Sequence, residues 1–147
     1  MSVTLDANVL VYASNEAEPE HEPARGLVER LAAGPEIAYL FWPTIMGYLR
    51  IVTHPSVLPR PLSPKDAISN IETLVAAPHF RTPGEEDGFW SLYLMTRGDA
   101  DRGNDVPDGH LAALMRQHGV RTIYTRDRDF RRFDGIIVED PFGSDRE

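Results

Sequence analysis

Short apolar runs rich in β-branched and aromatic residues alternate with helical segments along most of the chain, and this alternation constrains the fold more than any other feature. The runs expected to form strands cover residues 3–6, 36–41, 79–83, 121–125 and 135–140. Strands that are separated by helices form a parallel sheet with helices on both faces. The sequence therefore predicts an α/β fold, a three-layer α/β/α sandwich with a mainly parallel sheet of four to five strands.

The helical segments between these runs are expected at residues 8–15, 23–33, 43–53, 64–76, 85–98 and 107–118. Proline at the first helical position and glycine after the last turn mark several of these boundaries: Pro43, Pro64, Pro107, Gly34 and Gly119. In the segment 85–98, the spacing of Phe89, Leu92 and Met95 is that of one helix face.

The chain of 147 residues suits one domain, which we expect to span residues 1–147. It contains no cysteine, which excludes disulfides, thiolate chemistry and cysteine–zinc sites and fits the cytoplasm. No apolar run approaches the roughly 18 residues of a membrane span, and the first residues lack a signal-peptide pattern, so we expect no membrane association. The net charge of −8 argues against broad nonspecific binding to nucleic acid without excluding a local basic strip.

Four carboxylates fall where strands end or helices begin. Asp6 follows the first strand, Asp108 lies in the first turn of its helix, and the pair Asp127 and Asp129 follows the strand at 121–125. Because ligands bind beyond the carboxyl ends of parallel strands, these groups would form an oxygen-rich pocket for a hard divalent cation. Two such metals activate water and stabilise the leaving oxygen in phosphodiester hydrolysis.

Each of these acidic residues also has a purely structural explanation. Asp6 could cap the helix that follows it, and Asp108 could be a favourable charge at the positive end of a helix dipole. Either Asp127 or Asp129 could cap the turn that precedes the next basic segment. The other acidic residues near Asp108 are expected in a solvated loop: Asp99, Asp101 and Asp105.

Basic and aromatic residues near the predicted pocket are open to two interpretations. The arginines after the strand at 121–125 either hold RNA phosphates or form an exposed face; they are Arg126, Arg128, Arg131 and Arg132. His110 is two residues from Asp108, and it either approaches the mouth of the pocket or has a structural role. The aromatic residues Trp42, Phe89 and Trp90 are interpreted as core or interface anchors rather than as platforms for base stacking.

The segments "LDANVLVYA", "RGNDVPDGHLAAL" and "TRDRDFRRF" together resemble the PIN domain, specifically that of the VapC toxins of bacterial toxin–antitoxin pairs. The resemblance extends through "FWPTIMGYLRIVTHP" and "EDPF" and so covers nearly the whole chain. It implies a PIN-like α/β/α sandwich and an endoribonuclease that depends on Mg²⁺ or Mn²⁺. It also implies inhibition by a cognate VapB-like antitoxin, and a homodimer.

The resemblance assigns roles to individual residues. Asp6 and Asp108 match acidic metal ligands of the family, and Asp127 and Asp129 match the acidic stretch after the fourth strand, with the ligand between these two left open. The polar positions of the family that hold carboxylates or water are matched by Asn8 and Asn104. Together with the residue-based interpretation of the arginines, this gives the predicted substrate-binding set: Asn8, Asn104, Arg126 and Arg128.

One position departs from the family pattern. Many PIN nucleases carry a glutamate just before the "FLR"-like segment, where this chain has Gly47 before "YLR". The site would then hold one metal tightly and a second weakly, or use another acid. This departure supports an alternative function, a catalytically weak PIN module that mainly binds RNA or a protein partner. A phosphatase of the haloacid dehalogenase type ranks lower, because that chemistry needs a second aspartate where this chain has Asn8.

Overall fold

Five strands form the parallel sheet that the alternation predicts. The computed structural model describes residues 2–143, so Met1 and residues 144–147 of the expected domain lie outside the described residues. The strands are β1 (Ser2–Leu5), β2 (Ile37–Tyr39), β3 (Phe80–Arg81), β4 (Thr122–Tyr124) and β5 (Ile137–Glu139). They pair in the order β3-β2-β1-β4-β5, and every neighbouring pair is parallel. β1 is therefore the central strand.

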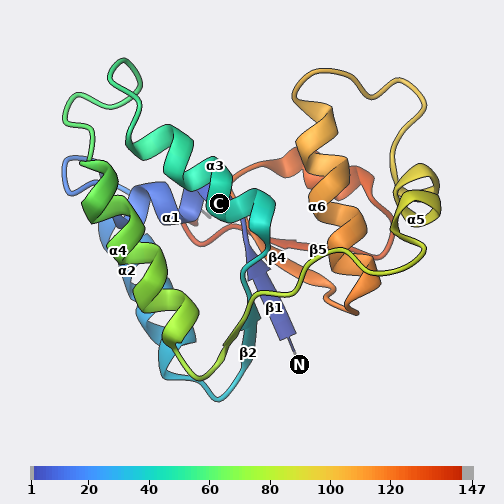
Figure 1. Ribbon diagram of the computed structural model, residues 1–147, viewed down its shortest axis with the longest axis horizontal. Coiled ribbons are helices and arrows are strands. Elements are labelled where there is room, and N and C mark those ends of the chain that lie inside the picture. The colour runs from blue at the N-terminus through green and yellow to red at the C-terminus, as the bar shows by residue number, and fades with distance from the viewer. Residues whose placement is uncertain (1, 144–147) are drawn as a thin grey trace.

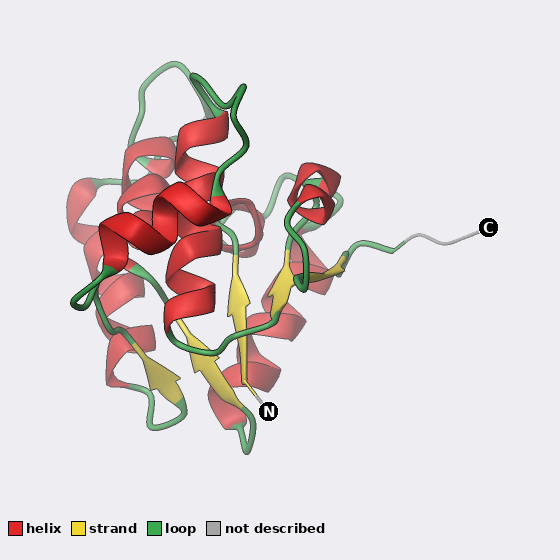
Figure 2. Ribbon diagram, turned by 90° about the vertical axis from the view of Figure 1, so that its right-hand side faces the viewer, coloured by secondary structure: helices red, strands yellow, loops and turns green. Residues whose placement is uncertain are grey.

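Helices cover both faces of this sheet. They are α1 (Ala7–Ala13), α2 (His21–Ala33), α3 (Trp42–Val52), α4 (Pro64–Ala76), α5 (Phe89–Thr96) and α6 (Asp105–Gln117), with a 3-10 helix η1 (Arg128–Arg132). α1 to α4 gather on one side of the strands, and α5 and α6 lie on the other (Figure 1). The turned view shows the strands next to one another (Figure 2). One apolar core joins the sheet to α1–α4 and a second lies under α6 and η1, which confirms the three-layer sandwich.

The carboxyl end of β1 is fixed by hydrogen bonds to two neighbouring elements. Thr44 of α3 is buried, and its Oγ1 donates to the Leu5 carbonyl at 3.2 Å. The backbone N–H of Asp6 donates to the Tyr124 carbonyl at the end of β4, at 3.0 Å. Because buried polar groups need such partners, these bonds set the position of Asp6 relative to both α3 and β4.

α6 begins at Asp105, two residues before the start that Pro107 predicts. A proline is tolerated throughout the first helical turn, because the N–H groups there have no acceptor within the helix. The earlier start places Asp105 inside the helix, so the prediction that it lies in a solvated loop is wrong. Asp108 remains in the first turn, as predicted.

α5 begins at Phe89 rather than near residue 85. Gly88, which precedes it, has a φ of 85°, a left-handed conformation that glycine adopts readily and that a helix does not continue through. The predicted face is also shifted, because Met95 is 78% exposed. The less exposed side of α5 carries Leu92, Tyr93 and Thr96. Within residues 2–143, no helix combines the length and the apolar character that a membrane crossing requires.

Candidate active site

Asp6 lies between the end of β1 and the start of α1, and its two carboxylate oxygens have different partners. Oδ1 accepts a hydrogen bond from the Ala7 N–H at 2.7 Å, so Asp6 caps α1, as its structural explanation predicts. Oδ2 accepts from Thr125 Oγ1 at 2.8 Å and from Asn8 Nδ2 at 3.4 Å. Burial raises the pKa of Asp6 above its usual value, and the negative charge of Asp127 raises it further. The cap is therefore also a carboxylate whose ionisation is unfavourable.

Asp108 reaches the same region from the first turn of α6, and its side chain is 21% exposed. Burial raises the pKa of Asp108 to about 7, and the charges of Asp127 and Asp6 contribute to this shift. The structure thus brings Asp6 and Asp127 close enough to Asp108 for their charges to oppose its ionisation. A shift of this size, with named charge partners in a cleft, is typical of functional sites.

Asp127 and Asp129 occupy different positions, although the sequence treats them alike. Asp127 caps η1, where its Oδ1 accepts from the Asp129 N–H at 2.9 Å. Asp127, and not Asp129, is among the charges that raise the pKa values of Asp6 and Asp108. Asp129 is exposed. The geometry therefore groups Asp127 with the other two acids and leaves Asp129 on the outer side of η1.

A cleft of about 220 Å³ opens between α1, α3 and α6, and two of the predicted acids line it. Its lining includes Asp6, Asn104, Asp108, Gly47 and Arg50. A Cβ atom at Gly47 would meet only the Ala7 Cβ, at an ordinary 3.5 Å, so the cleft has room for a side chain there. Arg50 is exposed on α3 and was not predicted as a site residue; its position one turn after Gly47 is the signal that could have found it.

Thr125 was also missed, although it links two of the acids. It is fully buried at the end of β4; its Oγ1 donates to Asp6 Oδ2 and accepts from the Asp127 N–H at 2.9 Å. Asn8 Nδ2 lies 3.3 Å from the same hydroxyl. Asn8 Oδ1 is buried without a hydrogen-bond partner among the described residues. A hydroxyl placed directly after a core strand and two residues before an aspartate was the available sequence signal.

The arginines predicted to hold substrate differ in their surroundings. Arg126 forms an ion pair with Glu20 at 2.7 Å, donates to Tyr12 Oη at 3.1 Å and lies over the Tyr12 and Phe142 rings. It is thus held by α1, by the segment before α2 and by the residues after β5. Arg128 is exposed on η1.

Arg132 lies among acidic residues of the α5–α6 connection and α6. Its guanidinium is 3.4 Å from Asp101 Oδ2, 4.0 Å from Asp105 Oδ1 and 3.8 Å from Asp108 Oδ2. The side chain of Asp101 is only 8% exposed, so the prediction of a solvated loop is wrong for this residue as well. Asp101 Oδ2 accepts a hydrogen bond from the Gly98 N–H at 2.9 Å, and Arg132, 31 positions away, gives this buried carboxylate a charged partner.

Two further predictions concern side chains around the cleft. His110 Nε2 is 2.6 Å from Glu85 Oε2, which places it against the segment before α5. Trp90, interpreted from the sequence as a core or interface anchor, is 68% exposed and stacks on Tyr93 with ring centroids 5.7 Å apart, which excludes the core alternative and leaves the interface alternative open.

The donors at this edge fit a hard divalent cation, although the cluster is not closed. Within residues 2–143, no three acidic or histidine side chains are already gathered closely enough to hold a metal ion. The pKa values of Asp6 and Asp108 are raised in spite of the hydrogen bonds to Asp6 and the charge of Arg132 near Asp108, so their negative charges are only partly compensated, and Asn8 Oδ1 is an unpaired oxygen beside Asp6 among the described residues. Mg²⁺ and Mn²⁺ prefer oxygen ligands of this kind, and Asp6, Asp108 and Asp127 are the carboxylates available to them.

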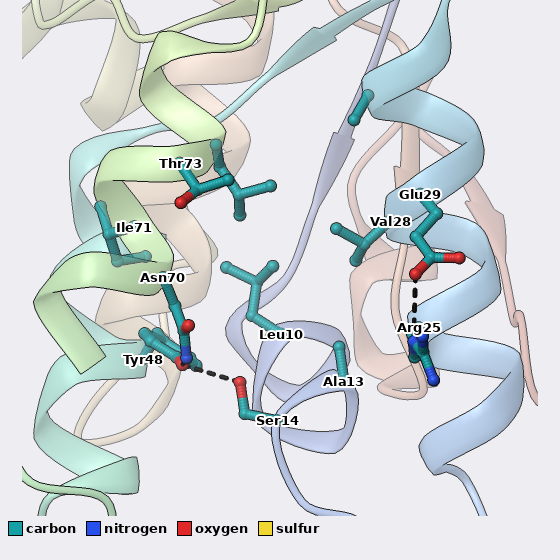
Figure 3. Close-up of a pocket in the computed structure, with 12 residues that line it drawn as sticks. Leu10, Ala13, Ser14, Arg25, Val28, Glu29, Tyr48, Asn70, Ile71 and Thr73 are labelled. Atoms are coloured by element: carbon teal, nitrogen blue, oxygen red, sulfur yellow. Dashed lines mark hydrogen bonds and ion pairs between the residues drawn. The ribbon is translucent and has the colours of Figure 1, made fainter. Parts of the chain in front are cut away.

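A larger and mostly apolar hollow of about 340 Å³ lies away from these acids, among α1, α2, α3 and α4. Figure 3 shows Leu10, Val28 and Ile71 along its walls, with the Arg25–Glu29 ion pair at one side. The Ser14 hydroxyl and Asn70 Nδ2 meet the Tyr48 hydroxyl at 2.7 and 3.0 Å. This hollow shares no lining residue with the acidic cleft.

The sequence matches one protein-family model and is similar to several known proteins. A family model described as PIN domain matches residues 3–136. The chain is 52% identical over 143 residues to Ribonuclease VapC48 of Mycobacterium tuberculosis, covering 97% of this chain and 99% of that protein. It is 39% identical over 132 residues to Ribonuclease VapC43 of the same organism, covering 88% of each.

Solved structures share the fold at low sequence identity. The crystal structure of VapC20 of Mycobacterium tuberculosis, a Sarcin-Ricin loop cleaving toxin, matches with a TM-score of 0.65 at 16% identity, covering 92% of this chain and 98% of that one. The structure of FitAcB from Neisseria gonorrhoeae has a TM-score of 0.65 at 24% identity and covers 95% and 98%. These likenesses support the α/β/α arrangement.

The raised pKa of Asp108 predicts how stability depends on pH when metal is removed with a chelator. Between the ordinary value of 3.8 and about 7, the folded protein keeps a proton on Asp108 that the unfolded chain has released. The folded state therefore binds more protons, and this group makes stability fall as the pH rises. Asp108→Asn removes that contribution. The free energy of unfolding of the variant, relative to that of the parent, should therefore increase as the pH rises from 4 to 7. Urea unfolding at several pH values measures this, and a constant difference would contradict it.

Proposed function

The chain belongs to the PIN-domain family, and from this premise we propose that it is a metal-dependent endoribonuclease, the toxin of a VapBC-type toxin–antitoxin pair. Relatives named as VapC ribonucleases, at up to 52% identity over nearly the whole chain, support the nuclease function. The observation that carries the proposal is that Asp6 and Asp108 line one cleft, and that the charge of Asp127 raises the pKa of both. The repulsion within such a cluster is unfavourable even where its members cap helices, and a cation compensates it.

Asp6, Asp108 and Asp127 are proposed to hold a Mg²⁺ or Mn²⁺ ion at the cleft. A metal of this type supplies water activation and stabilisation of the leaving oxygen in phosphodiester hydrolysis. Thr125 holds the Asp6 carboxylate through its hydroxyl proton and accepts a bond from the backbone of Asp127. It is therefore proposed to be the residue that positions both acids. Asn8 and Asn104 lie beside these acids and are proposed to orient water or substrate.

RNA is the proposed substrate, and a cognate VapB-like antitoxin is the proposed inhibitor, in the cytoplasm. Arg128, which is exposed on η1, and Arg50, which lines the cleft, are the side chains proposed to contact phosphates. Arg126 is already paired with Glu20, so its proposed contribution is to fix the segment that carries Arg128. The solved complexes FitAB and VapBC2 from Rickettsia felis share the fold and support an antitoxin partner. A homodimer is proposed as well, supported by the exposed apolar side chains of Trp90 and Met95 on α5.

Replacing Asp108 is the direct test of the nuclease function. Asp108→Asn should abolish cleavage of RNA in the presence of Mn²⁺, because the variant loses a charged ligand while keeping nearly the same shape. The measurement is a gel assay of RNA fragments, with circular dichroism to compare folding. The matched control is Asp66→Asn, which also removes a first-turn carboxylate, from α4, and should cleave like the parent.

Two outcomes would contradict this function. Cleavage at the parent's rate by Asp108→Asn would exclude the proposed role of this residue. A parent protein that binds RNA or the antitoxin but does not cleave RNA with Mg²⁺ or Mn²⁺ would favour the alternative of a catalytically weak PIN module.

The pair Asp127 and Asp129 allows a second test. Asp127→Asn should reduce the rise in melting temperature that excess Mn²⁺ produces, because a ligand that binds the folded state more weakly stabilises it less. Asp129→Asn removes the same charge two residues away, from an exposed side chain, and should leave that rise unchanged. The reverse pattern would show that Asp129 is the ligand.

Gly47 allows a test of the departure from the family pattern. Gly47→Glu adds a carboxylate to a cleft that has space for it, so it should tighten Mn²⁺ binding measured by calorimetry. Gly26→Glu on α2 is the matched control, because it adds the same charge and the same gain in helix propensity where no atom lies within 4 Å of a new Cβ. Equal affinities in the two variants would mean that position 47 does not contribute to the metal site.

A further inference from the structure

Arg132 is the charged partner that three acidic residues around the start of α6 share. Within residues 2–143, the ion pairs of Asp101, Asp105 and Asp108 all involve this one guanidinium. The three carboxylates come from the α5–α6 connection and from the first turn of α6, whereas Arg132 ends η1. The contact therefore joins segments that follow different strands of the sheet.

The guanidinium donates a hydrogen bond to Asp101 Oδ2 at 3.4 Å, and it also lies within ion-pair distance of the other two carboxylates. Its distances to the three carboxylates lie between 3.4 and 4.0 Å, longer than the 2.7–2.9 Å of a close charged hydrogen bond. Its own position is fixed from the other side: it lies 4.2 Å from the centroid of the Phe133 ring, and Nη1 donates to the Asp129 carbonyl at 3.2 Å. A cation held in this way compensates a cluster of charges.

We propose that Arg132 is an internal counter-cation of the active site. It stabilises the cluster of Asp101, Asp105 and Asp108 in the metal-free protein and competes with a divalent cation for Asp108. The compensating role depends only on the contacts described above. The competing role rests on the proposed function, because it requires a metal at Asp108.

The competition follows from the atoms involved. Arg132 Nη1 lies 3.8 Å from Asp108 Oδ2, and Asp108 is a proposed metal ligand. A divalent ion bound there and the guanidinium would repel each other across a short distance in a half-buried site. Metal binding therefore has to displace Arg132 or overcome its charge. As a result, the affinity for metal is lower than the proposed ligands Asp6, Asp108 and Asp127 would give without this arginine.

The first measurement is thermal unfolding in the presence of a chelator. R132Q keeps a hydrogen-bond donor for Asp101 and removes the charge, so its melting temperature should fall below that of the parent. R131Q is the matched control, because it removes the same charge from the exposed neighbouring position of η1 and should change the melting temperature much less. R132K keeps the charge and should recover most of the loss.

A double-mutant cycle separates charge compensation from packing. If Arg132 compensates Asp108, then D108N should stabilise the R132Q protein more than it stabilises the parent, because an uncompensated carboxylate costs more. Packing of the arginine stem on Phe133 would give the same gain in both backgrounds. R132Q/D108N also serves where R132Q alone does not fold, since recovery of folding in the double variant is itself the expected coupling.

The second measurement is Mn²⁺ binding by isothermal titration calorimetry. R132Q should bind Mn²⁺ about three- to tenfold more tightly than the parent, as expected from removing one nearby positive charge. R131Q should bind Mn²⁺ within about twofold of the parent, because charge effects fall steeply with distance and exposure. R132K should also bind Mn²⁺ within about twofold of the parent, because it keeps the positive charge.

Each outcome decides one part of the proposal. Equal melting temperatures of R132Q and R131Q in chelator, or an absent coupling with D108N, would overturn charge compensation. Unchanged or weaker Mn²⁺ binding by R132Q would overturn the competition and leave Arg132 as a tether between η1 and α6. A parent protein that binds no Mn²⁺ would refute both the metal in the proposed function and the competition, while the chelator measurements would still decide compensation.

Discussion

Asp6, Asp108 and Asp127 lie near one edge of the sheet, although burial and the repulsion between negative charges both oppose this arrangement. The hydrogen bonds and charges around these acids partly compensate the two unfavourable effects. Burial opposes the ionisation of Asp6 and Asp108, and the charge of Asp127 opposes it further. Carboxylates placed in this way destabilise a fold unless hydrogen bonds or cations compensate them. Asp6 and Asp127 come together because they follow β1 and β4, which are neighbouring parallel strands and therefore end at the same edge of the sheet.

Backbone and hydroxyl donors provide the first part of the compensation. The Ala7 N–H at the start of α1 binds one oxygen of Asp6, and Thr125 binds the other. A helix N-terminus and a buried hydroxyl both favour the ionised form, so they act against the effect of burial. The capping role and the proposed metal-binding role of Asp6 are therefore compatible, since the cap uses Oδ1 at 2.7 Å while Oδ2 belongs to the Thr125 network. The sequence alone presents them as alternatives because it cannot assign separate oxygens.

The fold could be predicted from local patterns, and the site only in part. Alternating strands and helices fix the parallel sheet, and a charge after a core strand identifies Asp6. Contacts between distant segments have no such pattern. The pairing of Arg126 with Glu20, and of Arg132 with Asp101, joins residues 106 and 31 positions apart. Periodicity carries no information on such pairs, so the sequence predicts neither the pairing of Arg126 with Glu20 nor the burial of Asp101. The sequence could not distinguish Asp127 from Asp129, because the two side chains differ only in their places at the start of η1. Asp127 caps this helix and Asp129 lies exposed within it.

Gly47 and Arg132 shift the charge of the cleft in the same direction. A glycine where many PIN nucleases carry a glutamate removes one negative charge, and the guanidinium of Arg132 offsets part of another at Asp108. Both changes reduce the repulsion that the metal-free fold has to withstand, and both reduce the attraction for a cation. In the proposed metal site, stability without metal and affinity for metal would thus be coupled through the same few side chains. A chain with Gly47 and Arg132 favours the first, and a carboxylate at position 47 with a neutral residue at position 132 would favour the second.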